Sequence, residues 1–152
     1  MALINRVLIL GAGALGAMYA RALAATNGVE AAFIADGERA DRLRNGGVIV
    51  NDTPVKLPVL AAPSGTEETI LLIVALKHHQ LAEGIELARP FVRENTLLLS
   101  VMNGIESEQR LAAAFGRRQV VHAVAVGMDA VREENRVHYT AMGKIRFGRG
   151  FE

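Results

Sequence analysis

The 152-residue chain contains no cysteine, and only 5% of its residues are aromatic. The absence of cysteine excludes disulfide bonds, thiolate metal sites and a cysteine nucleophile. Net charge is also nearly absent, because 17 Lys and Arg residues balance 16 Asp and Glu residues. The chain therefore has no global field to attract nucleic acid or an anionic membrane, and an anionic ligand must be held by local geometry.

Long hydrophobic runs are missing as well. The longest, 7–10 and 70–76, are too short to cross a bilayer. Residues 1–10 have no basic segment before their apolar stretch, unlike a secretory signal peptide. We therefore expect a cytoplasmic protein without a membrane partner. The length fits one domain over residues 1–152, and 51% hydrophobic residues suffice for a sizeable core.

Apolar runs of strand length alternate with helical patterns along the chain. We expect strands at residues 6–10, 30–35, 70–76, 96–101 and 119–126, and helices at 14–25, 38–45, 80–88 and 105–115. Such alternation predicts right-handed crossovers. The fold class is therefore α/β, a Rossmann-type, doubly wound and mostly parallel sheet.

Two segments depart from this alternation. Residues 48–50 and 55–57 flank Asn51-Asp-Thr-Pro54 and predict a small antiparallel excursion. Residues 136–139 and 144–147 predict a closing hairpin. The glycine-rich residues 148–152 are typical of a domain boundary.

The first strand leads directly into a glycine-rich turn that opens the first helix. Its residues match the pattern G-x-G-x-x-G: Gly11, Ala12, Gly13, Ala14, Leu15 and Gly16. The three glycines permit, in order, a tight turn, close approach of the backbone to a diphosphate, and close packing of helix on strand. Backbone N–H groups at the helix start can then bind a dinucleotide without a lysine. The alternative is a turn that merely connects strand and helix.

Asp36 lies at the end of the second predicted strand, about twenty residues after the last glycine of the turn. A carboxylate there accepts hydrogen bonds from the adenosine ribose and repels the extra phosphate of NADP, which favours NAD. Alternatively, Asp36 caps the following helix. Arg39 is close enough in sequence to receive a 2′-phosphate.

Two more predicted strands end in polar residues. Lys77 follows the third long strand, at a helix start where a cation opposes the helix dipole, and Asn103 follows the fourth. Both are candidates for contact with a nicotinamide ribose and a reacting carbonyl. An exposed lysine and a simple Asn-Gly turn are the alternatives.

The histidines do not indicate a metal site. His78 and His79 are adjacent instead of four residues apart, and the chain has no H-E-x-x-H pattern. We interpret His122 as a strand residue without a task, and we predict no metal.

Taken together, these motifs resemble the ketopantoate reductase (2-dehydropantoate 2-reductase) family. Besides the glycine turn, the resemblance rests on Leu76-Lys77 with Gln80, on Met102-Asn103-Gly104-Ile105 with Glu108 and Leu111, and on residues 143–148. It implies NADPH-dependent reduction of a 2-keto acid, pantothenate biosynthesis, and Lys77 and Asn103 beside the nicotinamide ribose and the substrate.

The sequence departs from the family pattern in two ways. Asp36 stands where members usually carry an arginine that binds the NADP phosphate, so NAD and NADP both remain candidate cofactors. The family also continues into an all-helical domain that supplies a lysine proton donor and a substrate-binding glutamate. We expect that domain to be absent from these 152 residues and the chain alone to be inactive. Its absence would expose an apolar face through which a homodimer could form.

Two further functions stay open because fold and glycine turn do not select a substrate. One is the cofactor domain of another 2-hydroxy-acid dehydrogenase. The other is a non-catalytic dinucleotide-sensing module, which needs the turn and Asp36 but not Lys77 and Asn103.

Overall fold

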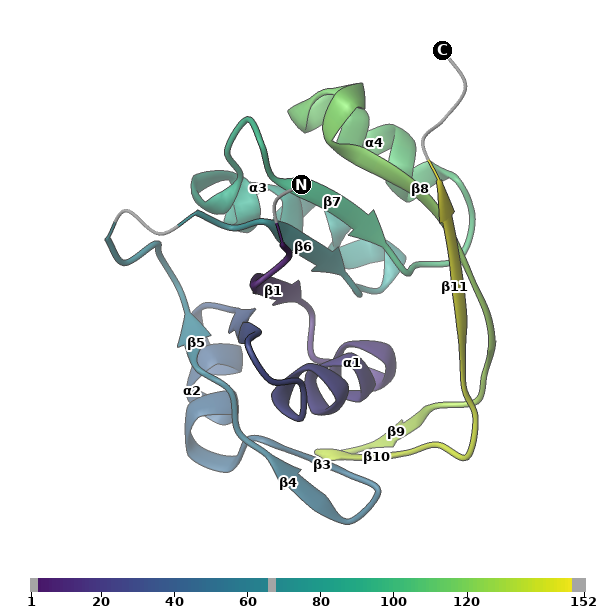
Figure 1. Cartoon of the computed structure of the whole chain (residues 1–152). Coiled ribbons are helices and arrows are strands. Elements are labelled where there is room, and N and C mark those ends of the chain that lie inside the picture. Colours follow the sequence, from purple (N-terminus) through teal and green to yellow (C-terminus); the bar gives the residue numbers. More distant parts are fainter. Residues whose placement is uncertain (1–2, 66–67, 149–152) are drawn as a thin grey trace.

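The computed structural model describes residues 3–65 and 68–148. Its centre is a seven-stranded sheet in the order β11-β8-β7-β6-β1-β2-β5 (Figure 1). The strands are β1 (Arg6–Leu10), β2 (Glu30–Ile34), β5 (Val59–Leu60), β6 (Leu71–Val74), β7 (Leu97–Ser100), β8 (Val120–Met128) and β11 (Met142–Gly148). All neighbours in this sheet run parallel except β8 and β11. The predicted mostly parallel Rossmann-type fold is thereby confirmed.

Helices cover both faces of the central sheet. They are α1 (Ala14–Ala24), α2 (Gly37–Gly46), α3 (Leu81–Ala88) and α4 (Glu106–Phe115), with short 3-10 turns η1 (His78–Gln80), η2 (Arg89–Phe91) and η3 (Arg117–Gln119). Side chains of α3 and α4 pack on one face of β1, which carries Leu8 and Leu10. Side chains of α1 pack on its other face, which carries Val7 and Ile9. Because both faces of β1 are covered, its residues form a continuous apolar run.

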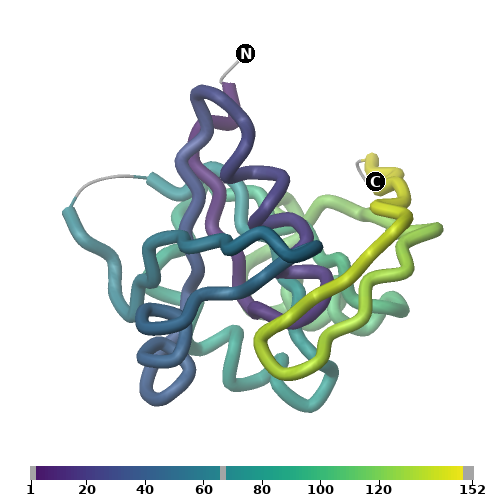
Figure 2. The backbone as a smooth tube through the Cα atoms, turned by 90° about the horizontal axis from the view of Figure 1, so that it is seen from below, coloured from purple at the N-terminus to yellow at the C-terminus, as the bar shows by residue number. Residues whose placement is uncertain are grey.

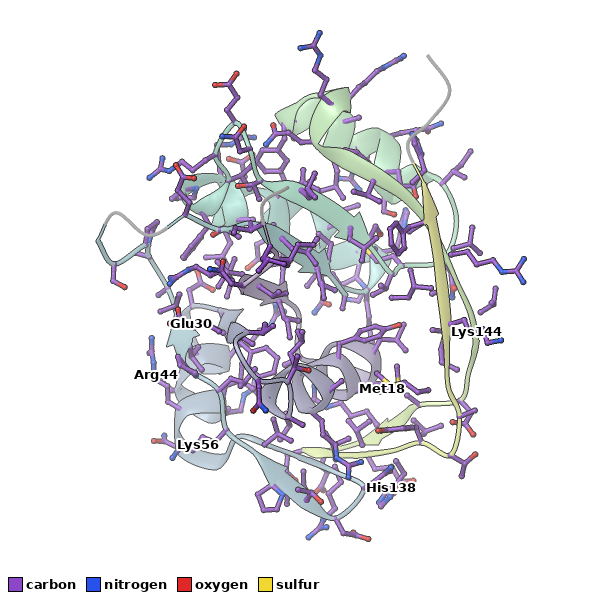
Figure 3. The ribbon with its side chains drawn as sticks, in the orientation of Figure 1. Met18, Glu30, Arg44, Lys56, His138 and Lys144 are labelled. Atoms are coloured by element: carbon purple, nitrogen blue, oxygen red, sulfur yellow. The ribbon has the colours of Figure 1, made fainter. Side chains whose placement is uncertain are left out.

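A second, four-stranded sheet lies on the far side of α1. Its strands are β3 (Val48–Val50), β4 (Thr53–Val55), β9 (Val131–Glu133) and β10 (Arg136–His138), in the order β4-β3-β10-β9. Buried valines from β3, β4 and β10 pack against Ala17 and Ala20 of α1. Met18, labelled in Figure 3, is also fully buried. The small side chains of Ala17 and Ala20 let α1 pack closely against the small sheet.

The small sheet joins distant parts of the chain. β10 pairs in parallel with β3, with Val137 opposite Val50. Next to this pairing, the side chain of Asn51 donates to the carbonyl oxygen of Tyr139 at 3.0 Å, and its oxygen accepts from the Tyr139 N–H at 2.9 Å. The side chain of Asn51 thus fixes the backbone that follows β10 next to β3.

The structure corrects several predictions. Residues 136–139 and 144–147 do not form a hairpin, because β10 joins the small sheet whereas β11 pairs with β8 as a long antiparallel ribbon. Figure 2 shows this ribbon along one side of the molecule. The predicted excursion is antiparallel as expected, but its second strand is 53–55 instead of 55–57. The short strands β5 and β9 were not predicted.

Candidate functional site

The glycine-rich turn lies between the end of β1 and the start of α1, as predicted. Gly11 has φ +104°, and a Cβ atom there would lie 2.4 Å from the carbonyl oxygen of Ala75. A Cβ atom on Gly16 would lie 1.9 Å from the carbonyl oxygen of Gly11. The turn can thus adopt this shape only without these two side chains. A Cβ atom on Gly13 meets nothing within 4 Å, so the backbone at Gly13 is open to solvent.

The N-terminus of α1 is electropositive. Its first turn contains no acidic residue, and Gly13 offers no side chain to cap it. The backbone N–H groups of residues 14–16 have no acceptor within the helix, because the first hydrogen bond of α1 runs from Ala17 to Gly13. Unpaired N–H groups and the helix dipole together favour an anion at this position.

A cleft of about 1140 Å³ opens beyond the carboxyl ends of β1, β2, β6 and β7. This is the edge at which open α/β sheets bind ligands. All but one of the candidate site residues line the cleft: Gly11, Ala12, Gly13, Ala14, Leu15, Asp36, Lys77 and Asn103. The exception is Gly16, which is buried beneath the turn. The structure therefore brings together residues that the sequence spreads over more than ninety positions.

Asp36 occupies the N-cap position of α2 but does not cap it. Its backbone is extended, and its exposed carboxylate makes no hydrogen bond to the helix. The sequence left open the alternative that Asp36 caps α2. The residue does occupy the N-cap position, but its side chain does not cap the helix. The carboxylate stays available to a ligand in the cleft.

Lys77 and Asn103 lie in two turns that contact each other. The N–H of Lys77 donates to the side chain of Gln80 at 3.1 Å, which fixes the first turn. His78 Nε2 lies 3.1 Å from Glu106 Oε2 and so links this turn to the start of α4, just after Asn103. Both Lys77 and Asn103 are exposed. Their side chains are therefore free to contact a ligand.

A buried hydrogen-bond pair supports the Asn103 turn. The hydroxyl groups of Ser100 and Ser107 lie 2.8 Å apart, and Ser100 Oγ accepts from the N–H of Met102 at 3.2 Å. The pair ties the end of β7 to α4. The backbone that leads into Asn103 is thus held in place.

Arginine side chains contribute more to the cleft than the sequence indicated. Arg39, Arg42 and Arg132 all line it. Only Arg39 was considered from the sequence. Arg42 follows Arg39 by three residues on α2, so helical periodicity could have predicted it. Arg132 comes from β9, nearly a hundred residues later, and no local signal identifies it.

His122 also has a role that the sequence did not suggest. Its Nδ1 lies 2.6 Å from Glu108 Oε2, and the other oxygen of Glu108 accepts from the Ala123 N–H at 2.9 Å. Glu108 is only 9% exposed. His122 lies on β8, as the sequence predicted, and this contact gives it a structural role that the sequence did not indicate, because it anchors β8 to α4.

The described residues contain no group of three His, Cys, Asp or Glu side chains arranged to hold a metal ion. Within the same residues, no helix is both long and apolar enough to span a membrane.

Comparison with known proteins adds independent information. The family model described as "Ketopantoate reductase PanE/ApbA" matches residues 7–150. The oxidoreductase YkpB of Bacillus subtilis (strain 168) is 24% identical over 139 residues, which cover 90% of this chain and 46% of YkpB. The chain thus spans about half the length of this curated relative.

Solved structures share the fold. The crystal structure of 2-dehydropantoate 2-reductase from Geobacter metallireducens GS-15 superposes with a TM-score of 0.78 and 29% identity, covering 95% of this chain and 49% of that one. D-mandelate dehydrogenase in ternary complex with NADH and anilino(oxo)acetate gives a TM-score of 0.74 at 19% identity, covering 88% and 45%. The second similarity establishes the fold alone.

Proposed function

Because the chain belongs to the ketopantoate reductase PanE/ApbA family, we propose that its cleft binds a nicotinamide dinucleotide for the reduction of a 2-keto acid. In the proposed reaction, the 2-keto group of ketopantoate becomes the hydroxyl group of pantoate. The observation that carries the proposal is the cleft itself, which collects the glycine turn, Asp36, Lys77 and Asn103. We assign these 152 residues the cofactor-binding part of that task.

The residues of the cleft fit a dinucleotide. The open backbone at Gly13 leaves room for a diphosphate, and the uncapped N-terminus of α1 supplies donors for it. The uncommitted carboxylate of Asp36 can accept from ribose hydroxyls. When bound, the nicotinamide supplies the hydride.

We assign Lys77 and Asn103 to the reacting end of the cleft. The ammonium group of Lys77 donates hydrogen bonds and favours a developing negative charge on a carbonyl oxygen. The Asn103 amide both donates and accepts, so it can orient a ribose hydroxyl and a carbonyl together. The supported turns on which both lie hold their backbones in place.

We further propose that NADH is preferred to NADPH. A carboxylate at Asp36 repels a 2′-phosphate, and this carboxylate has no cation paired with it among the described residues. The same observation favours a second candidate function, the NADH-dependent reduction of another 2-keto acid. D-mandelate dehydrogenase, which shares the fold, was solved with NADH.

The proposal is tested by calorimetric titration of the chain with NADH and NADPH. Gly13→Ala places a methyl group in open space, so we expect unchanged folding but at least about tenfold weaker binding, because the methyl group occupies the path of the diphosphate. Gly148→Ala is the matched control, since its Cβ atom also meets nothing within 4 Å but lies at the end of β11. Failure of the unmodified chain to bind either cofactor contradicts the proposal.

Turnover gives a second test. We expect the 152-residue chain to bind NADH yet to reduce ketopantoate negligibly, because the described cleft holds no second lysine near Lys77 to act as general acid. A positioned acid contributes on the order of a hundredfold or more to such a step. Rapid oxidation of NADH by this chain with ketopantoate, followed at 340 nm as absorbance, would contradict this division of labour.

A further inference from the structure

Three arginine side chains line the cleft, and one of them, Arg132, contacts the glycine turn. Arg39 and Arg42 lie three residues apart on α2 and so share the face of that helix that lines the cleft. Arg132 approaches from β9, on the small sheet. Helix α2 and the small sheet therefore both bring positive charge to the same cleft.

Contacts of Arg132 hold its guanidinium group against the turn. Its Nη1 donates to the carbonyl oxygen of Ala12, the second residue of the turn. Its Nε donates to the carbonyl oxygen of Glu134 at 2.5 Å. An arginine has five N–H donors, so three remain for a ligand. The group is thus fixed in place with donors to spare.

Arg42 lies close enough to Arg132 for their charges to interact. Partial burial lowers the pKa of the Arg132 guanidinium from its ordinary value, and the positive charge of Arg42 lowers this pKa further. Two like charges in proximity are unfavourable unless an anion lies between them. Arg39, Asp36, Lys77, Glu83 and Glu134 are the other charged groups along the cleft.

No carboxylate neutralises this pair. Across residues 3–65 and 68–148, neither Arg42 nor Arg132 forms an ion pair with an Asp or Glu side chain. By contrast, Arg44 on the same helix pairs with Asp41 at 3.7 Å, and Arg89 pairs with Glu86 at 2.8 Å. No carboxylate of the described residues therefore neutralises the charges of Arg42 and Arg132 in the cleft.

From this geometry we infer that Arg42 and Arg132 together bind a phosphate group of the dinucleotide, as a second phosphate site beside the glycine turn. The inference rests on the proposed function. The planar guanidinium group matches phosphate oxygens in pairs of hydrogen bonds, and partial exclusion of water strengthens them. Two phosphates have this chemistry, the central diphosphate of either cofactor and the 2′-phosphate monoester of NADPH.

Titration calorimetry of two arginine variants tests the inference. Arg42→Gln removes a charge without breaking any protein hydrogen bond of the described residues, whereas Arg132→Gln also breaks the contacts with the carbonyl oxygens of Ala12 and Glu134. We expect each to weaken binding at least about fivefold, because a charge-assisted hydrogen bond is lost. Arg118→Gln is the matched control, since Arg118 is exposed on η3, away from the cleft.

The choice of ligand separates the two phosphates. If the pair binds the diphosphate, the variants weaken NADH, NADPH and ADP alike. If it binds the monoester, they weaken NADPH and 2′-AMP while NADH and ADP stay unchanged. Either result supports the second phosphate site, and the latter also shows that the arginines counteract Asp36.

Unchanged dissociation constants for all four ligands in Arg42→Gln, with unchanged thermal unfolding, would overturn the inference while leaving the proposed function intact. Loss of binding by the unmodified chain would instead overturn the proposed function. Arg132→Lys adds a further check, because lysine keeps the positive charge but lacks the paired N–H donors of the guanidinium group. Binding weakened by Arg132→Gln but fully restored by Arg132→Lys would show a purely electrostatic contribution, contrary to paired hydrogen bonds.

Discussion

The central parallel strands and the β8–β11 ribbon belong to one sheet, yet different forces stabilise them. Leu72 of β6 and Leu98 of β7 are fully buried between helices. On the ribbon, Val124 is 60% exposed and Phe147 is 74% exposed. Figure 3 likewise shows Lys144 on the outer side of β11. Parallel strands require cover on both faces, whereas an antiparallel pair tolerates one face in water.

Because of this difference, the region that forms the site and the ribbon are stabilised in different ways. Burial holds the centre, and the strand ends of the centre form the cleft. Strand pairing, a partly buried inner face that includes Ala125 and Ile145, and polar contacts such as those of Glu108 and Asp129 hold the ribbon. Substitutions in the two regions should therefore differ both in magnitude and in physical cause.

The largest contrast is expected between matched apolar truncations. Leu72→Ala should lower the free energy of unfolding by about 3 kcal/mol, because it removes buried methyl groups and leaves a cavity between packed helices. Phe147→Ala should change it by less than about 0.5 kcal/mol. Urea unfolding followed by circular dichroism measures both. Equal losses would show that the ribbon is packed as tightly as the centre.

An intermediate effect is expected where a helix anchors the ribbon. Glu108→Ala leaves the Ala123 N–H and His122 without their acceptor, so the free energy of unfolding should fall by about 1–2 kcal/mol. Hydrogen exchange of the Ala123 amide should accelerate more than exchange at β6. Glu94→Ala, at an exposed position, serves as the control. Unchanged hydrogen exchange at the Ala123 amide would contradict the conclusion that Glu108 anchors β8 to α4.

The smallest effect is expected at the end of the ribbon and depends on pH. Hydrogen bonds from the Thr140 hydroxyl, the Ala141 N–H and the Thr140 N–H lower the pKa of Asp129 from its ordinary value. A depressed folded-state pKa gives stability that is present above the unfolded value of about 3.9 and lost as pH falls through the folded value.

Asp129→Asn should therefore reduce Tm slightly at neutral pH, and the difference from the unmodified chain should shrink as the pH falls below the unfolded value of about 3.9 and disappear once the carboxylate is protonated in the folded state. Thermal unfolding over a series of buffers tests this. A difference in Tm that stays the same in the most acidic buffers would show that ionisation of the Asp129 carboxylate does not stabilise the folded state.

The same contrast explains which parts of the fold could be predicted. Strands buried on both faces read as continuous apolar runs, so β1 was predicted with the bounds that it has, and β6 was predicted one residue too early at its start and two residues too late at its end. Residues 144–147 of β11 alternate between polar and apolar, which specifies a strand but not its partner. The prediction therefore paired residues 144–147 with their neighbour in sequence, residues 136–139, although the actual partner β8 precedes both β10 and β11.

The candidate site follows a similar rule. The turn, Asp36, Lys77 and Asn103 directly follow strands of the parallel sheet, and the topology of that sheet brings strand ends together. Arg132 could not be predicted in this way, because its place depends on the pairing of β10 with β3. The strand β5, with only two residues, is too short to leave a pattern.

The contact of Asn51 with Tyr139 has a consequence for synthesis on the ribosome. The two residues are 88 positions apart, so at about 5–20 residues per second the partner of Asn51 is made roughly 4 to 18 s later. During this interval the alanine face of α1 lacks the valine of β10 that covers it. The nascent chain therefore leaves that face of α1 without its β10 cover until β10 emerges from the exit tunnel.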